Sequence, residues 1–171
     1  MPPEGLQSLL APLMPALMAK AADNIQRMRE QTQSVLLDMA HRSTQCFELV
    51  VHHLFDDEDA RKSKQNANNP RRVIAKLGFT AQLVRTFSLK GSLGVDAIMT
   101  RKVVPALDSP NVDVRQAAIL LAAEAQLRQP KAMKPHVENL KANAQTSIQE
   151  AAEHLRNNPP APGRPVPDRA S

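Results

Sequence analysis

Apolar residues recur at helical spacing along most of the chain, in stretches separated by polar turns. The stripe within residues 6–22 predicts an amphipathic helix, and Pro15 predicts a kink in it. Further stripes predict helices after the Asp23–Asn24 turn, from Ser43 or Thr44 to Phe55, after Pro70, from Val95 to Leu107, after Pro110, and from about Pro135 to Arg156. No strand pattern competes with them. The predicted fold class is therefore all-α.

The same stripes define the expected core and the expected helix starts. Ser43 or Thr44, Asn69 and Ser109 are predicted N-caps, because short polar side chains can accept hydrogen bonds from the first free N–H groups of a helix. The residues expected on buried faces are Met28, Thr32, Val35, Leu36, Met39 and Ala40; Cys46, Leu49, Val50, Leu54 and Phe55; Val73, Leu77, Ala81 and Val84; Val95, Ile98, Met99, Val103 and Leu107; and Val114, Ala118, Leu121 and Ala125.

An arginine near the start of a helix returns at an even interval. Arg29, Arg72 and Arg115 are spaced by 43 residues, which lies within the roughly 40–47 residues of HEAT and armadillo units. Such units bury their apolar faces by stacking on their neighbours. The spacing predicts an α-solenoid of about three HEAT-like helix pairs plus a C-terminal helix. The turns within the pairs are expected near residues 23–25, 56–69 and 108–110.

Two segments lack helical periodicity. Residues 56–69 are polar and are predicted to form a solvated loop, and the proline-rich residues 157–171 are predicted to form a disordered tail. The domain prediction is accordingly a HEAT/TOG-like α-solenoid over residues 1–156 followed by the tail.

Composition narrows the range of partners. The net charge of +5 favours an acidic partner such as an acidic protein, nucleic acid or an anionic membrane. The absence of Trp and Tyr disfavours binding of single-stranded nucleic acid by base stacking. No run is long and apolar enough to predict a membrane span or a good signal peptide. A single cysteine suits a reducing compartment, so a cytoplasmic location is expected.

Sequence motifs give little support to catalysis, a cofactor or a metal. His52 and His53 precede an acidic run, but adjacent histidines on a helix point about 100° apart and do not converge on one ion. The segment from Gly91 to Gly94 lacks the Gly-Lys-Ser pair of a phosphate-binding loop. Cys46 lies on an apolar stripe, which indicates a core residue. The chain is therefore expected to be non-enzymatic.

The expected binding surface is the edge at which the turns within the pairs line up, called here the turn edge. Residues 24–27, 68–71 and 110–113 would place polar caps and long basic side chains there, and a plain solvated surface is the alternative. The arginines spaced by 43 residues are expected to be structural, reaching back to Asp23 or Asp108 and tying neighbouring repeats together. The predicted partner-binding residues are Asn24, Arg27, Asn68, Arg71, Lys102, Asn111 and Asp113.

Several short stretches resemble HEAT repeats. Met14-Pro15-Ala16-Leu17, Asp23 and Met28-Arg29 are similar to the HEAT pattern, and Val104-Pro105-Ala106-Leu107-Asp108 with Val114-Arg115 repeats it. Three segments further resemble the TOG domain of the ciliary-tip centrosomal protein family: residues 24–30, residues 69–71, and Gly94-Val95-Asp96-Ala97-Ile98-Met99 leading into residues 103–107. The resemblance covers about residues 6–140.

The resemblance implies a module that binds tubulin or the microtubule lattice, alongside other ciliary or centrosomal proteins, in the cytoskeleton of the cilium, axoneme or centrosome. The chain has fewer units than a full TOG domain and lacks the tryptophan that many TOG domains carry in their first turn. Free tubulin and the lattice therefore stay open as alternatives. The rival interpretations are a HEAT-repeat scaffold for another protein complex, which would use its concave helix face, and a HEAT-like DNA-binding enzyme.

Overall fold

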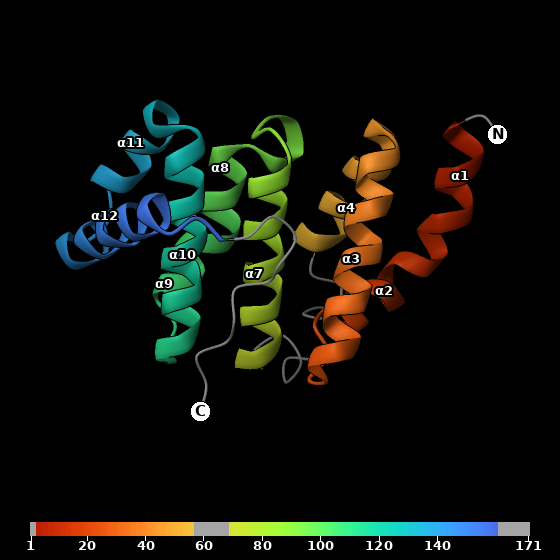
Figure 1. Ribbon diagram of the computed structural model, residues 1–171, viewed down its shortest axis with the longest axis horizontal. Coiled ribbons are helices and arrows are strands. Elements are labelled where there is room, and N and C mark those ends of the chain that lie inside the picture. Colours follow the sequence, from red (N-terminus) through yellow and green to blue (C-terminus); the bar gives the residue numbers. More distant parts are fainter. Residues whose placement is uncertain (1–2, 57–68, 161–171) are drawn as a thin grey trace. The chain divides into compact units, whose positions relative to one another are not determined.

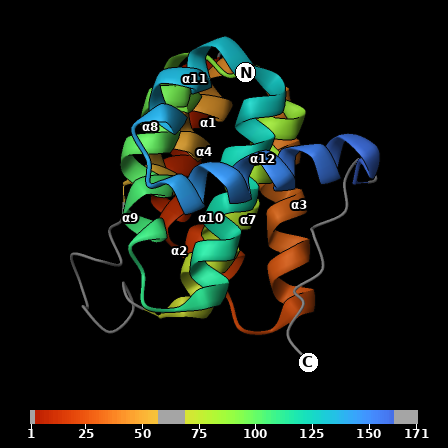
Figure 2. The same cartoon turned by 90° about the vertical axis from the view of Figure 1, so that its left-hand side faces the viewer.

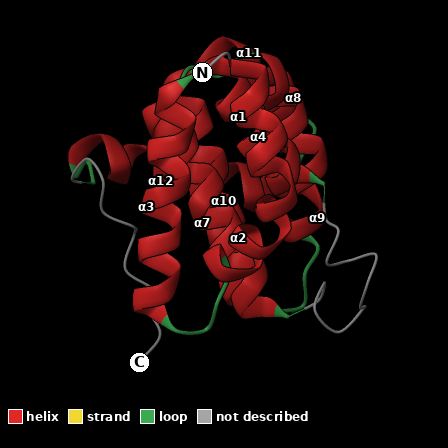
Figure 3. Ribbon diagram, turned by 90° about the vertical axis from the view of Figure 1, so that its right-hand side faces the viewer, coloured by secondary structure: helices red, strands yellow, loops and turns green. Residues whose placement is uncertain are grey.

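The computed structural model describes residues 3–56 and 69–160 as two compact units, which are treated separately here. Unit 1 comprises Met1–Lys76 and unit 2 comprises Leu77–Ser171. All regular elements of the described ranges are helical, as the colouring of Figure 3 shows. The predicted all-α fold class is thus confirmed.

Unit 1 contains helices of 8 to 17 residues (Figure 1). Its elements are α1 (Pro3–Leu10), the 3₁₀ turn η1 (Ala11–Leu13), α2 (Met14–Ala21), α3 (Gln26–Arg42), α4 (Thr44–Phe55) and the first residues of α7 (Pro70–Thr86). The expected interruption of the first helix lies at η1, because Pro12 and Pro15 have no N–H to donate to the preceding turn. Both α2 and α4 pack against α3.

The start and the buried face of α4 agree with the sequence pattern. The Ser43 side chain accepts a hydrogen bond from the backbone N–H of Cys46 at 3.1 Å, and so caps the helix. Cys46 is buried with the rest of its stripe, which confirms it as a core residue. Val50 and Leu54 are almost completely buried on the same face.

The buried face of α3 differs from the prediction. Met28 and Val35 are 40% and 49% exposed, whereas Thr32, Gln33 and Leu36 are buried. The Gln33 side chain donates a hydrogen bond to the carbonyl oxygen of Ala21 at 2.9 Å. The last carbonyls of a helix have no partner within it, so Gln33 satisfies a buried acceptor at the end of α2. The need for this donor explains why Gln33 is buried, although the apolar periodicity of the helix predicted that Met28 and Val35 would be buried.

Unit 2 begins within α7 and contains seven further helical segments. They are η2 (Gly91–Leu93), α8 (Val95–Ile98), the π-turn η3 (Met99–Val103), α9 (Val104–Leu107), α10 (Val112–Arg128), α11 (Pro130–Glu138) and α12 (Ala142–Asn157). The helix expected over residues 95–107 therefore carries a π-turn in its middle. The N–H of Val104 bonds to the carbonyl of Met99, five residues back, immediately before Pro105, which has no N–H to donate.

The α10 helix forms the centre of unit 2. Its stripe of Val114, Ala118, Leu121 and Ala125 is buried as predicted, and α9, α11 and α12 all pack against it. The Arg128 side chain donates to the carbonyl oxygen of Arg85, and Gln129 donates to that of Leu89 at 2.7 Å. The end of α10 thus supplies donors to the residues at and after the end of α7.

A buried ion pair also joins α7 and α10. The Arg85 Nε atom lies 3.0 Å from Oε1 of Glu124, in contact but without hydrogen-bond alignment. Burial raises the pKa of the Glu124 carboxyl, and the charges of Arg85 and Arg128 act in the opposite direction. A buried charge without a partner destabilises a fold, so the charged form of Glu124 depends on the nearby charges of these arginines.

Two sequence predictions for unit 2 are wrong. The N-cap of α10 is Asn111 rather than Ser109, since the Asn111 side chain accepts from the N–H groups of Asp113 and Val114 at 2.9 and 3.2 Å. The last helix is not continuous, because α11 and α12 are separated at residues 139–141. Lys141 there is extended. Consequently α12 lies across α10, as Figures 1 and 2 both show.

Candidate functional site: the turn edge

In unit 1, the turn between α2 and α3 is held by an aspartate. The Asp23 carboxylate accepts hydrogen bonds from the backbone N–H of Ile25 at 3.0 Å and from Lys20 Nζ at 3.1 Å. These two bonds to the charged form place the pKa of Asp23 below its usual value. The Asp23 carboxylate therefore stabilises the turn.

Arg29 returns to this turn from the first turn of α3. Its Nη1 atom donates to the backbone carbonyl oxygen of Asp23 at 3.0 Å. The expected structural role of Arg29 in the turn is thus confirmed, but the acceptor is the main chain instead of the carboxylate. The described bond lies within a single turn, so it does not tie neighbouring repeats together.

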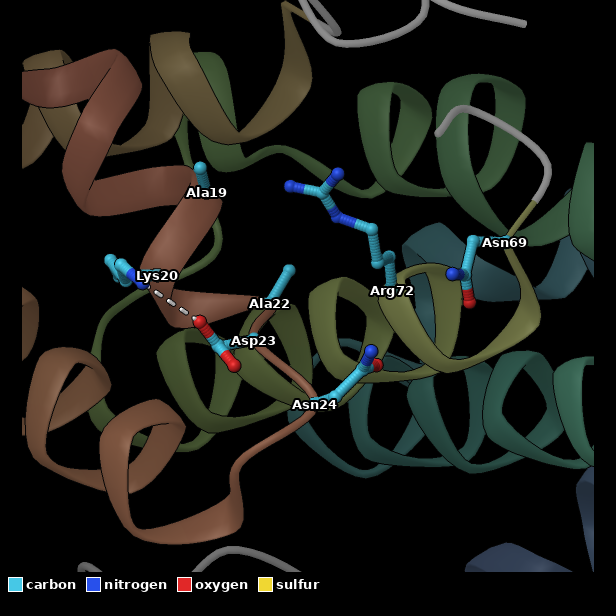
Figure 4. Close-up of a pocket in the computed structure, with 7 residues that line it drawn as sticks. All are labelled: Ala19, Lys20, Ala22, Asp23, Asn24, Asn69 and Arg72. Atoms are coloured by element: carbon cyan, nitrogen blue, oxygen red, sulfur yellow. Dashed lines mark hydrogen bonds and ion pairs between the residues drawn. The ribbon is translucent and has the colours of Figure 1, made fainter. Parts of the chain in front are cut away.

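The start of α7 lies beside this turn within unit 1. Asn69 Oδ1 accepts from the N–H of Arg71 at 3.1 Å, which confirms the predicted cap with proline behind it. Asn69 and Arg72 line one side of a cavity of about 320 Å³, and the turn residue Asn24 lines it as well. Figure 4 shows Arg72 extending from α7 toward α2, with Lys20 and Asp23 opposite. The structure therefore brings two of the three predicted turn-edge segments together.

The predicted binding residues of unit 1 are mostly on the surface. Asn24, Arg27 and Arg71 are exposed, and neither Arg27 nor Arg71 has an ion-pair partner among the residues that the structure describes. Asn68 lies outside the described residues. We call Asn24, Arg27, Asn69 and Arg71 the basic edge of unit 1. Sequence reasoning missed Lys20 and Arg72 as its neighbours, although their distance from the two turns in the sequence is short.

The equivalent turn of unit 2 has a different character. Asn111 is occupied as the α10 cap, and the exposed Asp113 adds an acidic charge beside it. Asp108 pairs with Lys141 at 3.9 Å. Lys102, which was predicted to bind a partner, is half-buried and is engaged in an interaction within the chain. The basic character that was expected along the whole turn edge is thus found at the turns of unit 1.

Arg115 repeats in unit 2 what Arg29 does in unit 1. Its Nη1 atom donates to the carbonyl oxygens of Ser109 and Pro110 at 2.7 and 3.0 Å. Both arginines thus reach the carbonyl of the residue six positions earlier. The acceptor is again the main chain, and the Asp108 carboxylate faces Lys141 instead.

Arg115→Met removes both of these hydrogen bonds while keeping much of the aliphatic bulk. Hydrogen bonds from a charged group are worth about 1.5–3 kcal/mol each when buried. Because one of these bonds is exposed to solvent and the other is part-buried, we expect Arg115 to contribute only about 1–3 kcal/mol in total. Urea unfolding measures the loss. Arg156→Met on the exposed end of α12 is the control, and equal stabilities for the two variants would contradict a structural role for Arg115.

The adjacent histidines His52 and His53 were the other candidates for a chemical site. The rings of His52 and His53 meet edge to face with centroids 5.3 Å apart, and His52 Nε2 lies 4.0 Å from the Asp56 carboxylate. The described ranges hold no group of three or more potential metal-ligating side chains. Within the same ranges, no helix is long and apolar enough to cross a membrane.

Comparison of the chain with protein-family models, with curated proteins and with solved structures gives no significant match in any of the three.

Proposed function

We propose that the chain is a non-enzymatic HEAT-like α-solenoid module that binds tubulin, in the microtubule lattice, through the basic edge of unit 1. The module would act in the cytoskeleton of a cilium or centrosome. The sequence resemblance supplies the identity of the partner. The position and chemistry of the exposed residues support the mode of binding.

The repeated helix-and-turn design supports a solenoid. The α3, α7 and α10 helices each contain 17 residues, and each carries one of the arginines spaced by 43 residues in its first turn. Arg29 and Arg115 make the same bond to a carbonyl six residues earlier. A local device that recurs at the sequence period is typical of repeat proteins.

The observation that carries the binding mode is the adjacency of two turns in unit 1. Asn24 and Asn69 line one cavity, so Arg27 and Arg71 lie within three residues of it in sequence, on two separate elements. Both arginines are exposed, and Asp23, the one acid among the described residues that line the cavity, is engaged by Lys20. Arg27 and Arg71, which follow two neighbouring turns, thus expose positive charge to solvent.

Binding by such an edge is mainly electrostatic. Positive side chains facing an acidic protein surface raise the association rate and set the orientation of the complex. The helices behind the turns fix the backbone, so binding has to order the arginine side chains alone. Exposed charges are screened by salt over about 8–10 Å at physiological ionic strength, so the affinity should fall as salt is added.

Cosedimentation tests the proposal directly. We expect the full chain to pellet with microtubules at low salt, to pellet less as salt is raised, and to bind duplex DNA more weakly at the same ionic strength. Gel filtration with unpolymerised tubulin distinguishes lattice binding from binding of free tubulin. A chain that remains in the supernatant at all microtubule concentrations would contradict the proposal.

A second candidate function is supported by α3. Met28 and Val35 lie one heptad apart and are both substantially exposed, which places two apolar side chains on the same outward face of the helix. A HEAT scaffold that receives a partner on its helix face would use such a surface. In that case Arg27 and Arg71 would contribute little to binding.

A further inference from the structure

The first helical segments of unit 1 carry apolar side chains on their outer face as well as on their inner face. Exposed residues recur at helical spacing along α1, η1 and α2: Ser8, Leu9, Pro12, Leu13 and Ala16. Leu9 and Leu13 are 60% and 55% exposed, whereas Met14 and Met18 are buried. Both α1 and α2 pack against α4, and Figures 1 and 3 show α1 on the outside of unit 1. We call Leu9, Pro12, Leu13 and Ala16 the outer apolar face.

The outer apolar face also lacks charge. No Asp, Glu, Lys or Arg occurs between Glu4 and Lys20. Elsewhere in the described ranges, the large apolar side chains that are exposed all have a charged residue within three positions in the sequence: Ile25, Met28, Val35, Val104 and Val112. A helix on a protein surface normally carries charged or polar residues on its solvent side, and one that is apolar all round is normally covered. The outer apolar face therefore has the composition of an interface.

The lack of charge favours a second copy of the chain as the occupant. The chain has a net charge of +5, so two copies repel each other, and an uncharged face is where they can meet at the lowest electrostatic cost. An anionic membrane would favour Lys and Arg beside the apolar stripe, but the first such residue is Lys20. An acidic protein would be attracted to the basic edge of unit 1 instead.

The outer apolar face is complementary to itself in size. Leu9 lies near one end of it and the smaller Ala16 lies one heptad later, at the other end. A two-fold axis that pairs the segments antiparallel would place Leu9 opposite Ala16 of the second copy, and Pro12 opposite Leu13 of the second copy. A large side chain opposite a small one lets two helices approach closely and interdigitate.

We propose that the outer apolar face is a homodimer interface at which two copies of the chain pair antiparallel about a two-fold axis. The face is short, and interfaces that bury less than about 1,200 Å² in total are typically weak or transient. The dimer should therefore exchange with the monomer, and dilute samples should be monomeric. The inference does not rest on the proposed function, because the basic edge of unit 1 shares no residue with this face. A dimer would carry two basic edges, which would raise its avidity for a lattice of repeated sites.

Sedimentation velocity of the full chain, from about 1 µM to 1 mM, tests the proposal. The average mass of the wild type should rise toward twice that of the monomer as the concentration increases. Leu9→Glu/Leu13→Glu should remain monomeric, because like charges would meet across the two-fold axis. Both leucines are exposed in the monomer, so in dilute samples their replacement should leave the fold and its stability nearly unchanged, as circular dichroism would show.

Val104→Glu/Val112→Glu is the matched control, since it makes the same change of charge at exposed apolar positions of unit 2. It should dimerise like the wild type. A wild type that is monomeric at every concentration would overturn the proposal. Equal mass curves for the two double variants, whether both dimerise or both fail to, would overturn it as well.

A second measurement on the wild type does not depend on variants that fold. In ¹H–¹⁵N spectra, raising the protein concentration should shift the backbone amide signals of Leu9, Leu13 and Ala16 and leave those of Val104 and Val112 in place. Signals of the outer apolar face that do not change with concentration would overturn the proposal. A chain that stays monomeric but pellets with phosphatidylcholine vesicles would overturn it in favour of a lipid surface as the occupant.

Discussion

Leu121→Ala is expected to lower the free energy of unfolding by about 2–5 kcal/mol. Leu121 has no exposed surface, and its neighbours Ala118, Ala122 and Ala125 on α10 are also fully buried. The methyl group of alanine has no other rotamer that could bring it into the vacated volume, so the cavity should remain open. Urea unfolding followed by circular dichroism measures the loss.

Leu9→Ala provides a matched control for this prediction. It deletes the same atoms from a side chain that is 60% exposed on α1, so a change of less than about 1 kcal/mol is expected. The two variants should unfold with similar dependence on urea if only stability has changed. A Leu121→Ala protein that unfolds together with Leu9→Ala would show that α10 is not the centre of a packed unit.

Sequence periodicity alone predicted the helices and most buried faces, because apolar stripes report directly on burial. Leu36, Leu77, Val114 and Leu121 are all buried as expected. The caps at Ser43 and Asn69 were also predictable, since each depends on one side chain and the helix immediately after it. Local chemistry of this kind can be recognised in the sequence.

Two of the errors involve side chains that donate hydrogen bonds to main-chain carbonyls. Gln33 is buried because the carbonyl of Ala21 requires a donor, and periodicity contains no information on that acceptor. The break between α11 and α12 follows from an extended Lys141, with the Gln145 side chain donating to the carbonyls of Glu138 and Leu140. Such side-chain bonds to carbonyls are visible only once the helices are placed.

The turn edge was predicted in part for a similar reason. The regular spacing of the arginines predicted structural roles, and Arg29 and Arg115 have such roles. Their acceptors are main-chain carbonyls, which every residue carries and which the sequence therefore does not identify. The cavity beside Arg72 depends on the packing of α7 near the first turn. The repeat period predicted that the turns at residues 24–27 and 68–71 line up, but it gave no information on which side chains enclose the cavity between them.

The double reversal Arg27→Glu/Arg71→Glu is expected to weaken microtubule binding severalfold or more. Each substitution replaces attraction to an acidic surface with repulsion, and both positions belong to the basic edge of unit 1. The fold should survive, because both side chains are exposed, and surface substitutions usually change stability by less than about 0.5 kcal/mol. The thermal melting curve of the variant checks this.

A charge-matched control separates the edge from the net charge of the chain. Lys131→Glu/Arg156→Glu changes the total charge by the same amount at exposed positions of unit 2, and we expect it to bind nearly as well as the wild type at physiological salt. Comparable weakening by the two double variants would indicate a general electrostatic attraction without a defined surface.

The most direct test of the central claim is a microtubule cosedimentation curve for wild type and Arg27→Glu/Arg71→Glu, measured in parallel at one ionic strength. The account predicts that the wild type binds saturably and that the folded double variant binds severalfold or more weakly. If the folded double variant binds as tightly as the wild type, the basic edge is not the binding surface, and the exposed face of α3 with Met28 and Val35 becomes the better explanation.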